Sequence, residues 1–189
     1  GTPRVPAPPA GSPPHLLLVG VDTLRADHLG CGGCARATSP RLDALAAGGT
    51  LFTDVMAPAP WTLPSFAGAL TGLMPGLHGG FLGGVERNMD RQVPNRLRPD
   101  VVTLAVHLRA HGYRTAAFYA NPFFAFGLAE SFAEHAYHNL PADDLATMAA
   151  DWLARQRMEN RFKSVALAPH VARPEVGRHG PAGDSERCR

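Results

Sequence analysis

The chain has 189 residues and a nearly balanced charge, with 18 Lys and Arg against 16 Asp and Glu and a net charge of +2. So small a charge gives no electrostatic argument for a nucleic-acid or membrane partner. The apolar fraction of 45% is enough for one ordinary globular core. No apolar run approaches the roughly 20 residues that a membrane-spanning helix needs, and no signal peptide is recognisable, although an incomplete front end would hide one.

The first predicted element is a buried strand over residues 16–21. It follows a leader over residues 1–14 whose six prolines indicate an extended, solvated segment. A short apolar, partly β-branched run is typical of a strand buried in a parallel sheet. Asp22 falls at the carboxyl end of this strand, where open α/β sheets place ligands and catalytic groups. Asp22 is therefore a candidate metal ligand, and a loop or helix-capping carboxylate is the ordinary alternative.

Cys31 and Cys34 form a Cys-x-x-Cys pair that begins three residues after His28. This spacing can bind zinc, but a closed zinc site needs four ligands and the chain has no second pair. A redox pair would be expected beside a different βαβ pattern. We therefore expect no functional role for Cys31 and Cys34, and a functional cysteine pair is kept only as the alternative.

Residues 61–72, Trp-Thr-Leu-Pro-Ser-Phe-Ala-Gly-Ala-Leu-Thr-Gly, are the most informative stretch. Pro64 suits the first turn of a helix and Gly72 suits its end, so Thr62 is predicted to lie at a helix N-terminus. The free N–H groups and the dipole there favour an anion. A hydroxyl in that place can attack a phosphate or sulfate ester, and an ordinary N-cap is the alternative. We expect Thr62 and Asp22 to lie on one sheet edge, close enough to share a metal ion.

The other predicted elements alternate between helices and strands. Ser39 and Pro40 predict the start of a helix that ends at Gly48 and Gly49. Further predicted elements are a strand over 50–56, a loop over 73–99, a helix from about 101 to 111, a strand over 113–120 and a helix that starts near 141. This alternation implies a parallel or mixed sheet covered by helices.

Four separated blocks of sequence resemble the sulfatase branch of the alkaline phosphatase superfamily. The blocks are residues 21–30, 38–46, 59–65 and 70–79, and residues 111–118 and 126–132 are similar to the family's next helix–strand unit and loop. The resemblance covers roughly residues 15–156 and implies an alkaline-phosphatase-like α/β fold with helices on both faces of a parallel or mixed sheet. It also implies a metal-dependent hydrolase of sulfuric or phosphoric esters. In that enzyme Thr62 is the nucleophile, Asp22 binds metal, and Ser65 and His78 are possible anion-pocket or supporting residues.

The chain also departs from the family pattern. The sulfatase signature has a Cys or Ser, oxidised to formylglycine, where this chain has Thr62, and an Arg where it has Phe66. Threonine is not a substrate for that oxidation in the family, so a formylglycine nucleophile is not expected. A threonine nucleophile is similar to the phosphodiesterase and phosphotransferase relatives. Sulfatases often carry a second Asp at the position of Thr23, and many carry a Lys after the later strand, where this chain continues with residues 119–122.

The family's further metal-binding Asp and His residues, in its C-terminal half, have no counterpart here. After Arg155 the sequence loses apolar periodicity and becomes rich in Arg, Gly and Pro. We expect residues 157–189 to be irregular, as a disordered tail or as the out-of-frame end of a truncated gene, which we favour. The expected organisation is a leader over 1–14, the N-terminal part of a sulfatase-like catalytic domain over 15–156, and this tail.

The expected cofactor is a divalent metal ion, either calcium, zinc or manganese. The expected substrate is a small-molecule, glycan or lipid ester, with no nucleic-acid partner and no membrane segment in this chain. Family members are often periplasmic, secreted or membrane-anchored, but no signal here assigns a compartment. Two functions stay open: an ester hydrolase of which this chain is an incomplete copy, or a non-catalytic fragment or pseudoenzyme without a complete metal site.

Overall fold

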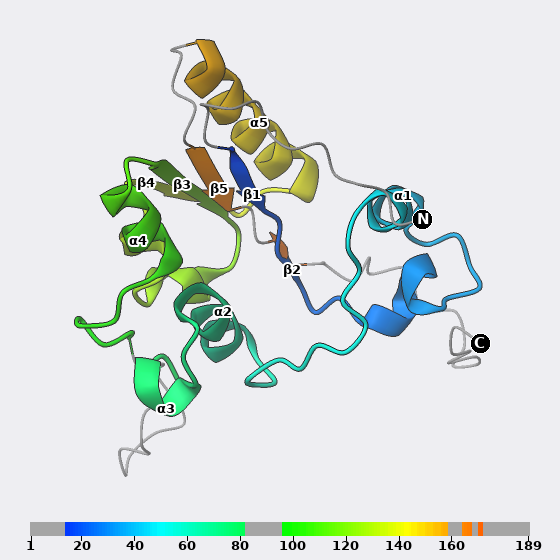
Figure 1. Ribbon diagram of the computed structural model, residues 1–189, viewed down its shortest axis with the longest axis horizontal. Coiled ribbons are helices and arrows are strands. Elements are labelled where there is room, and N and C mark those ends of the chain that lie inside the picture. The colour runs from blue at the N-terminus through cyan, green and yellow to red at the C-terminus, as the bar shows by residue number, and fades with distance from the viewer. Residues whose placement is uncertain (1–13, 82–95, 159–163, 168–169, 172–189) are drawn as a thin grey trace. The chain divides into compact units, whose positions relative to one another are not determined.

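The computed structural model describes residues 14–81, 96–158, 164–167 and 170–171. The described residues fall into two compact units. The larger unit contains residues 14–22 and the described part of 57–171, and it carries the sheet (Figure 1). The smaller unit contains residues 23–56.

The larger unit is built on a four-stranded sheet in which every neighbouring pair is parallel, in the order β1-β5-β3-β4. The strands are β1 (Leu16–Leu18), β3 (Arg114–Tyr119), β4 (Glu134–Tyr137) and β5 (Ser164–Leu167). A second parallel ladder joins β2 (Val21–Asp22) to β6 (His170–Val171). Leu17 and Ala116 both pair with Ala166, so β5 lies in the middle of the sheet.

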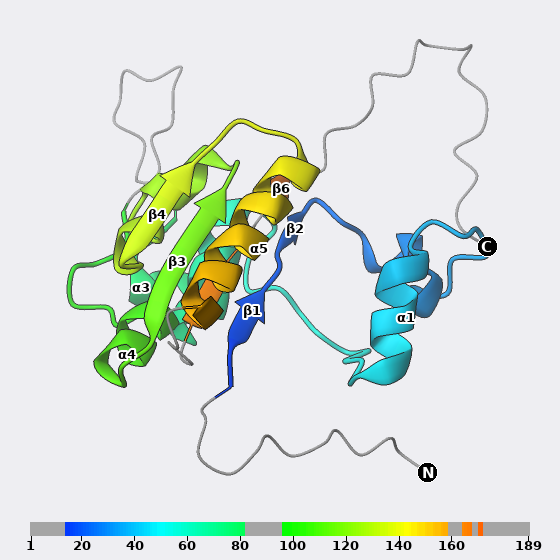
Figure 2. The ribbon, with the colours of Figure 1, turned by 90° about the horizontal axis from the view of Figure 1, so that it is seen from above.

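Helices cover both faces of this sheet, as predicted. α2 (Thr62–Thr71) and α4 (Leu104–Ala110) pack on one face and α5 (Ala142–Met158) on the other (Figures 1 and 2). β3 is buried almost throughout, and its alternate side chains supply the two cores. Ala117 and Tyr119 meet α2 and α4, whereas Ala116 and Phe118 meet α5. No described helix is long and apolar enough to cross a membrane.

Local sequence signals account for the ends of these helices. α2 ends at Gly72, whose φ of 70° lies in the left-handed region that glycine adopts without strain. α4 begins after Thr103, whose side chain accepts a hydrogen bond from the N–H of Val106. The short helix α3 (Pro75–His78) and the 3₁₀ turns η3 (Pro122–Ala125) and η4 (Ala129–Ser131) complete the larger unit.

The smaller unit joins α1 (Pro40–Gly48) to two 3₁₀ turns, η1 (Ala26–His28) and η2 (Gly30–Gly32). The carboxylate of Asp43 accepts hydrogen bonds from the Cys31 N–H at 2.8 Å and from the Ser39 hydroxyl at 2.9 Å. These donors, the Cys31 N–H first, hold the pKa of Asp43 below its usual value. Cys31 carries a free thiol, so it forms no disulfide with Cys34.

Several sequence predictions require correction. The strand predicted to be buried over residues 16–21 is divided into β1 and β2, and Leu17 and Val19 are 55% and 65% exposed because β1 lies at the edge of the described sheet. Residues 50–56 form no strand, and Leu51, Phe52 and Met56 are exposed there, because an apolar run needs a neighbouring strand to become one. β4 was missed because its side chains are mostly polar and exposed. The predicted loop over 73–99 contains helix α3, and its residues 82–95 lie outside the described ones.

The prediction of an irregular segment over 157–189 is wrong for residues Ser164–Leu167 and His170–Val171, which form strands β5 and β6. α5 also continues to Met158. The run Ser-Val-Ala-Leu is too short to show a period, but pairing with β1 on one side and β3 on the other holds it as a strand. A strand in the centre of the sheet argues against an out-of-frame sequence beginning near residue 156. Residues 1–13 and 172–189 lie outside the described residues, so their expected irregularity stays a prediction.

Candidate functional site

Three side chains meet where strands of the larger unit end. Asp22 is the last residue of β2, and Thr62 is the first residue of α2. Asn121 follows β3 after one intervening residue. The strands are parallel, so their carboxyl ends lie at one edge of the sheet, which is where α/β folds bind ligands.

Hydrogen bonds join these three side chains directly. The Thr62 hydroxyl donates to Asp22 Oδ2 at 2.8 Å, and Asn121 Nδ2 donates to the same oxygen at 2.7 Å. Asn121 Nδ2 also lies 3.4 Å from Thr62 Oγ1. The prediction that Asp22 and Thr62 lie close together is confirmed. Asn121 was not among the predicted site residues: residues 119–122 were noted only for lacking the lysine of many family members.

The Asn121 side chain is held at both ends. Its Oδ1 accepts a hydrogen bond from the Phe123 N–H at 2.9 Å, which caps η3, and the residue is only 5% exposed. The ring of Phe123 packs edge-on against Trp61, with centroids 5.6 Å apart. Since Trp61 directly precedes Thr62, this aromatic pair fixes the start of α2 against the segment that carries Asn121.

The backbone turns sharply after Asp22. Thr23 has a φ of 61°, in the left-handed region that β-branched residues rarely adopt. It is the one described residue other than glycine with a positive φ. Strained backbone of this kind concentrates at functional sites. Thr23 occupies the position at which sulfatases often carry a second Asp.

The two further predicted site residues lie in different surroundings. Ser65 is half-buried in the first turn of α2. His78, the last residue of α3, is fully buried, so it offers no surface to a ligand here. Its Nδ1 accepts the Gly80 N–H at 3.0 Å, while Nε2 completes no hydrogen bond of ordinary geometry. Burial lowers the pKa of His78, and the nearby Pro64 carbonyl opposes this only in part. His78 is therefore a neutral residue beneath the start of α2.

Phe66 replaces the arginine of the sulfatase signature and has a packing role. Its ring lies edge-on to that of Phe124, with centroids 5.0 Å apart. Phe124 is fully buried in the core between the sheet and α2. The position that carries a cation in the signature is thus part of the core in this chain.

The described residues do not complete a metal site. Within them, no group of three or more His, Cys, Asp or Glu side chains could hold a metal ion. This also removes support for a zinc site at His28, Cys31 and Cys34. Zinc usually takes four ligands and calcium six to eight. Asp22 offers one carboxylate, with the Asn121 and Thr62 side chains beside it.

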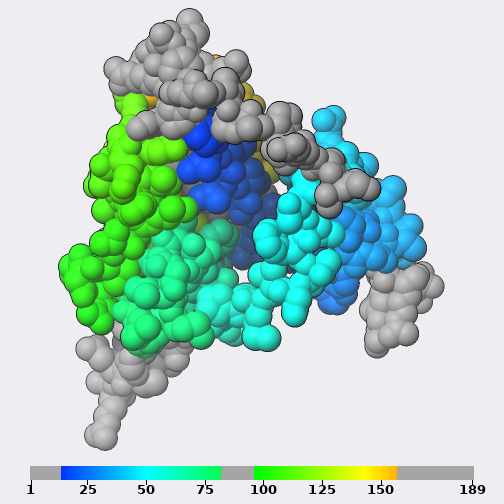
Figure 3. Space-filling view, viewed as in Figure 1, coloured from blue at the N-terminus to red at the C-terminus, as the bar shows by residue number. Residues whose placement is uncertain are grey.

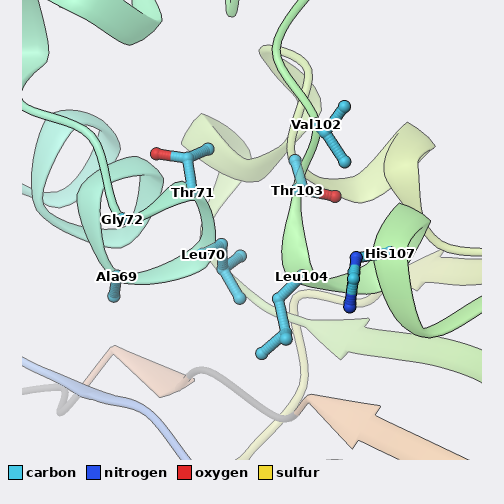
Figure 4. A pocket seen from close by; sticks show the side chains of 8 residues that line it. All are labelled: Ala69, Leu70, Thr71, Gly72, Val102, Thr103, Leu104 and His107. Carbon is cyan, nitrogen blue, oxygen red and sulfur yellow. The ribbon is translucent and has the colours of Figure 1, made fainter.

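A separate cavity of about 350 Å³ lies at the other end of α2, between that end and the start of α4 (Figure 4). Its two threonine hydroxyls make hydrogen bonds within the fold. Thr71 donates to the Ala67 carbonyl and Thr103 caps α4, while the His107 ring lies tilted against that of His111. Within the described residues, His107 is the one titratable side chain that lines this cavity, whereas a carboxylate, a hydroxyl and an amide meet at the strand ends, so the strand-end cluster is the better candidate.

Comparisons with known proteins identify a family and relatives of this chain. A family model described as Sulfatase matches residues 14–170. Arylsulfatase A of Bos taurus is 42% identical over 106 residues, which are 56% of this chain and 20% of that protein. Steryl-sulfatase of Mus musculus is 39% identical over 112 residues, or 59% of this chain and 18% of that protein. The structure of BT4656 in complex with D-glucosamine-2-N,6-O-disulfate superposes with a TM-score of 0.65 and 19% identity, covering 86% of this chain and 35% of that one.

The chain belongs to the sulfatase family. The match extends to residue 170, beyond the predicted range of 15–156, and it includes all of β5 and the first residue of β6. The chain spans about a fifth of the length of the curated relatives that it matches.

Proposed function

We propose that this chain is the nucleophile-bearing part of a sulfatase-family hydrolase that cleaves sulfuric or phosphoric esters. The hydrogen-bonded cluster of Thr62, Asp22 and Asn121 at the strand ends is the observation that carries the proposal. A hydroxyl, a carboxylate and an amide donor meet there, next to the N-terminus of a ten-residue helix.

Thr62 is the nucleophile in this proposal. Its Oγ attacks the phosphorus or sulfur atom, the bond to the leaving alcohol breaks, and water then breaks the new bond to Oγ. The first turn of α2 favours the negatively charged ester oxygens. Asp22 is the ligand that this chain offers to a divalent ion, either calcium, zinc or manganese. Ser65 and His78 support the start of α2. No step is assigned to the metal, because the described residues supply one carboxylate only.

The chemistry of Thr62 favours phosphorus over sulfur. Formylglycine releases sulfate by elimination, which a threonine ester cannot do, so the intermediate has to be displaced by water. Phe66 is neutral where the family pattern has an arginine, and residues 119–122 lack the lysine that many members carry after the later strand, which favours esters of a single negative charge. Phosphodiesters and phosphonate monoesters of a small molecule, glycan or lipid are the substrates that fit best, and nothing in the site suggests nucleic acid.

The nucleophile is tested by trapping it. The chain is incubated with aryl phosphate, aryl phosphonate or aryl sulfate and each candidate metal, and the peptide that contains Thr62 is analysed by mass spectrometry. We expect a phosphoryl or phosphonyl adduct on Thr62 that Thr62→Ala abolishes. Thr71→Ala is the matched control, because Thr71 lies at the other end of the same helix. An adduct that persists in Thr62→Ala would refute the assignment.

A second candidate is a non-catalytic fragment or pseudoenzyme. The single carboxylate at the site favours it, and for the same reason we expect little or no steady-state turnover by this chain alone. Absence of an adduct with every metal, together with no shift of the melting temperature on adding metal, would support this candidate over the hydrolase. Robust metal-dependent turnover that Thr62→Ala abolishes would exclude it.

A further inference from the structure

Two histidine side chains, His107 and His111, lie side by side at the carboxyl end of α4. They are four residues apart, a spacing that puts two side chains on one face of a helix. Their ring centroids are 4.4 Å apart and their ring planes are inclined by 40°. Both residues are exposed, and α4 lies on the visible surface of the larger unit in Figure 3, in green. Arg109 is two residues from each of them, so it points to another side of the helix.

The end of α4 holds the backbone of His111 in place. The next residue, Gly112, has a φ of 82°, in the left-handed region, and its N–H donates to the Arg109 carbonyl at 3.0 Å. The Tyr113 N–H donates to the Leu108 carbonyl, also at 3.0 Å. These two bonds together form the Schellman ending of a helix. His111 lies between the bonded segments, so a ligand that binds its ring does not first have to order the chain.

A hydrogen bond also determines which nitrogen of the His111 ring carries the proton. Its Nδ1 lies 2.9 Å from the backbone carbonyl oxygen of His107. A carbonyl oxygen can only accept, so Nδ1 carries a proton and donates it, and in the neutral ring the lone pair is on Nε2. Histidines that bind metals usually donate their other ring N–H to a carbonyl or a carboxylate in this way. His111 therefore has the tautomer and the supporting hydrogen bond of a metal ligand.

The cavity of about 350 Å³ between α2 and α4 adjoins this histidine pair. His107 lines it, and Figure 4 shows the His107 ring on α4, across from the end of α2. Zinc usually takes four ligands, so two imidazoles leave positions open on a bound ion. Water, or a donor atom of a small molecule in the cavity, can occupy those positions.

We propose that His107 and His111 form a binding site for a divalent transition metal ion, with exchangeable ligands on the side of the cavity. Imidazole nitrogen suits zinc, nickel and copper, whereas calcium prefers oxygen. A Zn–N bond is about 2.0–2.1 Å long, so two nitrogens on one ion lie at most about 4 Å apart, which rings in contact can satisfy. The carboxyl end of a helix also favours a cation. The site is independent of the proposed function, because the Asp22 and Thr62 side chains offer oxygen ligands only.

Titration of the full chain with Ni²⁺, followed by calorimetry, tests the proposal. Ni²⁺ binds imidazole and, unlike Cu²⁺, does not oxidise the free thiol of Cys31. We expect His107→Gln and His111→Gln each to weaken binding about tenfold or more, because each removes one of the two protein ligands. An excess of Ca²⁺ should not displace the Ni²⁺. His135→Gln, at an exposed histidine of β4, is the matched control and should leave binding unchanged.

A double variant tests the geometry of the pair. Arg109→His combined with His111→Gln keeps the number of histidines, but the second ring is then two residues from His107 and does not face it. This variant should bind Ni²⁺ as weakly as His111→Gln alone. Equal melting temperatures without metal would show that the exposed substitutions leave the fold intact.

Three results would overturn the proposal. They are wild-type affinity in both single variants, wild-type affinity in the double variant, and an equal loss of affinity in His135→Gln. None of these measurements involves turnover or the Thr62 hydroxyl. Ni²⁺ binding at the histidine pair without a Thr62 adduct would therefore count against the proposed function and leave this metal site standing.

Discussion

Substitution of Asn121 separates its two contributions to the site. Asn121→Ala removes both the cap on Phe123 and the donor to Asp22, whereas Asn121→Ser keeps an acceptor for the cap but cannot reach the carboxylate. A hydrogen bond to a charged group contributes about 1.5–3 kcal/mol, and the half-buried Asp22 puts this one near the lower end. A cap contributes about 1 kcal/mol. The free energy of unfolding should therefore fall by about 2 kcal/mol in Asn121→Ser and by about 3 kcal/mol in Asn121→Ala.

Urea unfolding followed by tryptophan fluorescence measures both values. Trp152 is buried against the Phe118 face of the sheet, so its emission reports on the larger unit. Asp151→Asn, at an exposed residue of α5, is the control. The reasoning would be refuted if both Asn121 variants stayed within about 0.5 kcal/mol of the parent. If Asn121→Ser and Asn121→Ala lowered the free energy of unfolding equally, the cap on Phe123 would contribute nothing to stability.

Three further predictions concern the surroundings of the site. Because burial lowers the pKa of His78, the unfolded chain protonates first as the pH falls; stability should be full above about pH 6.5 and decline below it. His78→Gln should flatten that decline in urea titrations at several pH values, and an unchanged slope would contradict the assignment. Thr103→Val keeps the shape of the side chain that caps α4 but removes the oxygen that accepts the Val106 N–H, so the free energy of unfolding should fall by about 1 kcal/mol. Thr103→Ser keeps that oxygen and is the control; equal melting temperatures for the Val and Ser variants would contradict the role of the cap. Phe66→Arg should lower the free energy of unfolding by about 2 kcal/mol or more, compared with less than about 1.5 kcal/mol for Phe66→Leu, without raising sulfate-ester turnover; a gain in that turnover would show that position 66 can still serve an anion pocket.

The parts of the fold that could be predicted have strong local signals. Pro64 and Gly72 bracket α2, and a continuous apolar run marks β3. The proximity of Asp22 and Thr62 followed from a rule about strand ends and helix starts rather than from any long-range contact. Each of these predictions depends on local signals: Asp22 and Thr62 are far apart in the sequence, but a strand end and a helix start place each of them separately.

The parts that could not be predicted depend on partners far away in the chain. β5 is four residues long, and it is a strand because β1 and β3 pair with it on both sides. β4 is polar because it forms an edge, so it lacks the apolar alternation that marks a strand. The segment 50–56 shows the opposite error, since its apolar residues suggested a strand for which the structure provides no neighbour.

Asn121 was overlooked for a different reason. Many family members carry a lysine after this strand, and the family pattern alone predicts only that this chain lacks it. The signal that was available is the Asn-Pro pair at the end of a predicted strand: Pro122 starts a turn, and an asparagine before it caps that turn with Oδ1. An amide held in this way has its Nδ2 group directed at a fixed place, which here is the Asp22 carboxylate. A residue that departs from a family pattern at a strand end can thus contribute hydrogen bonds of its own, as Asn121 does to Asp22, even though the charge of the family's lysine is lost.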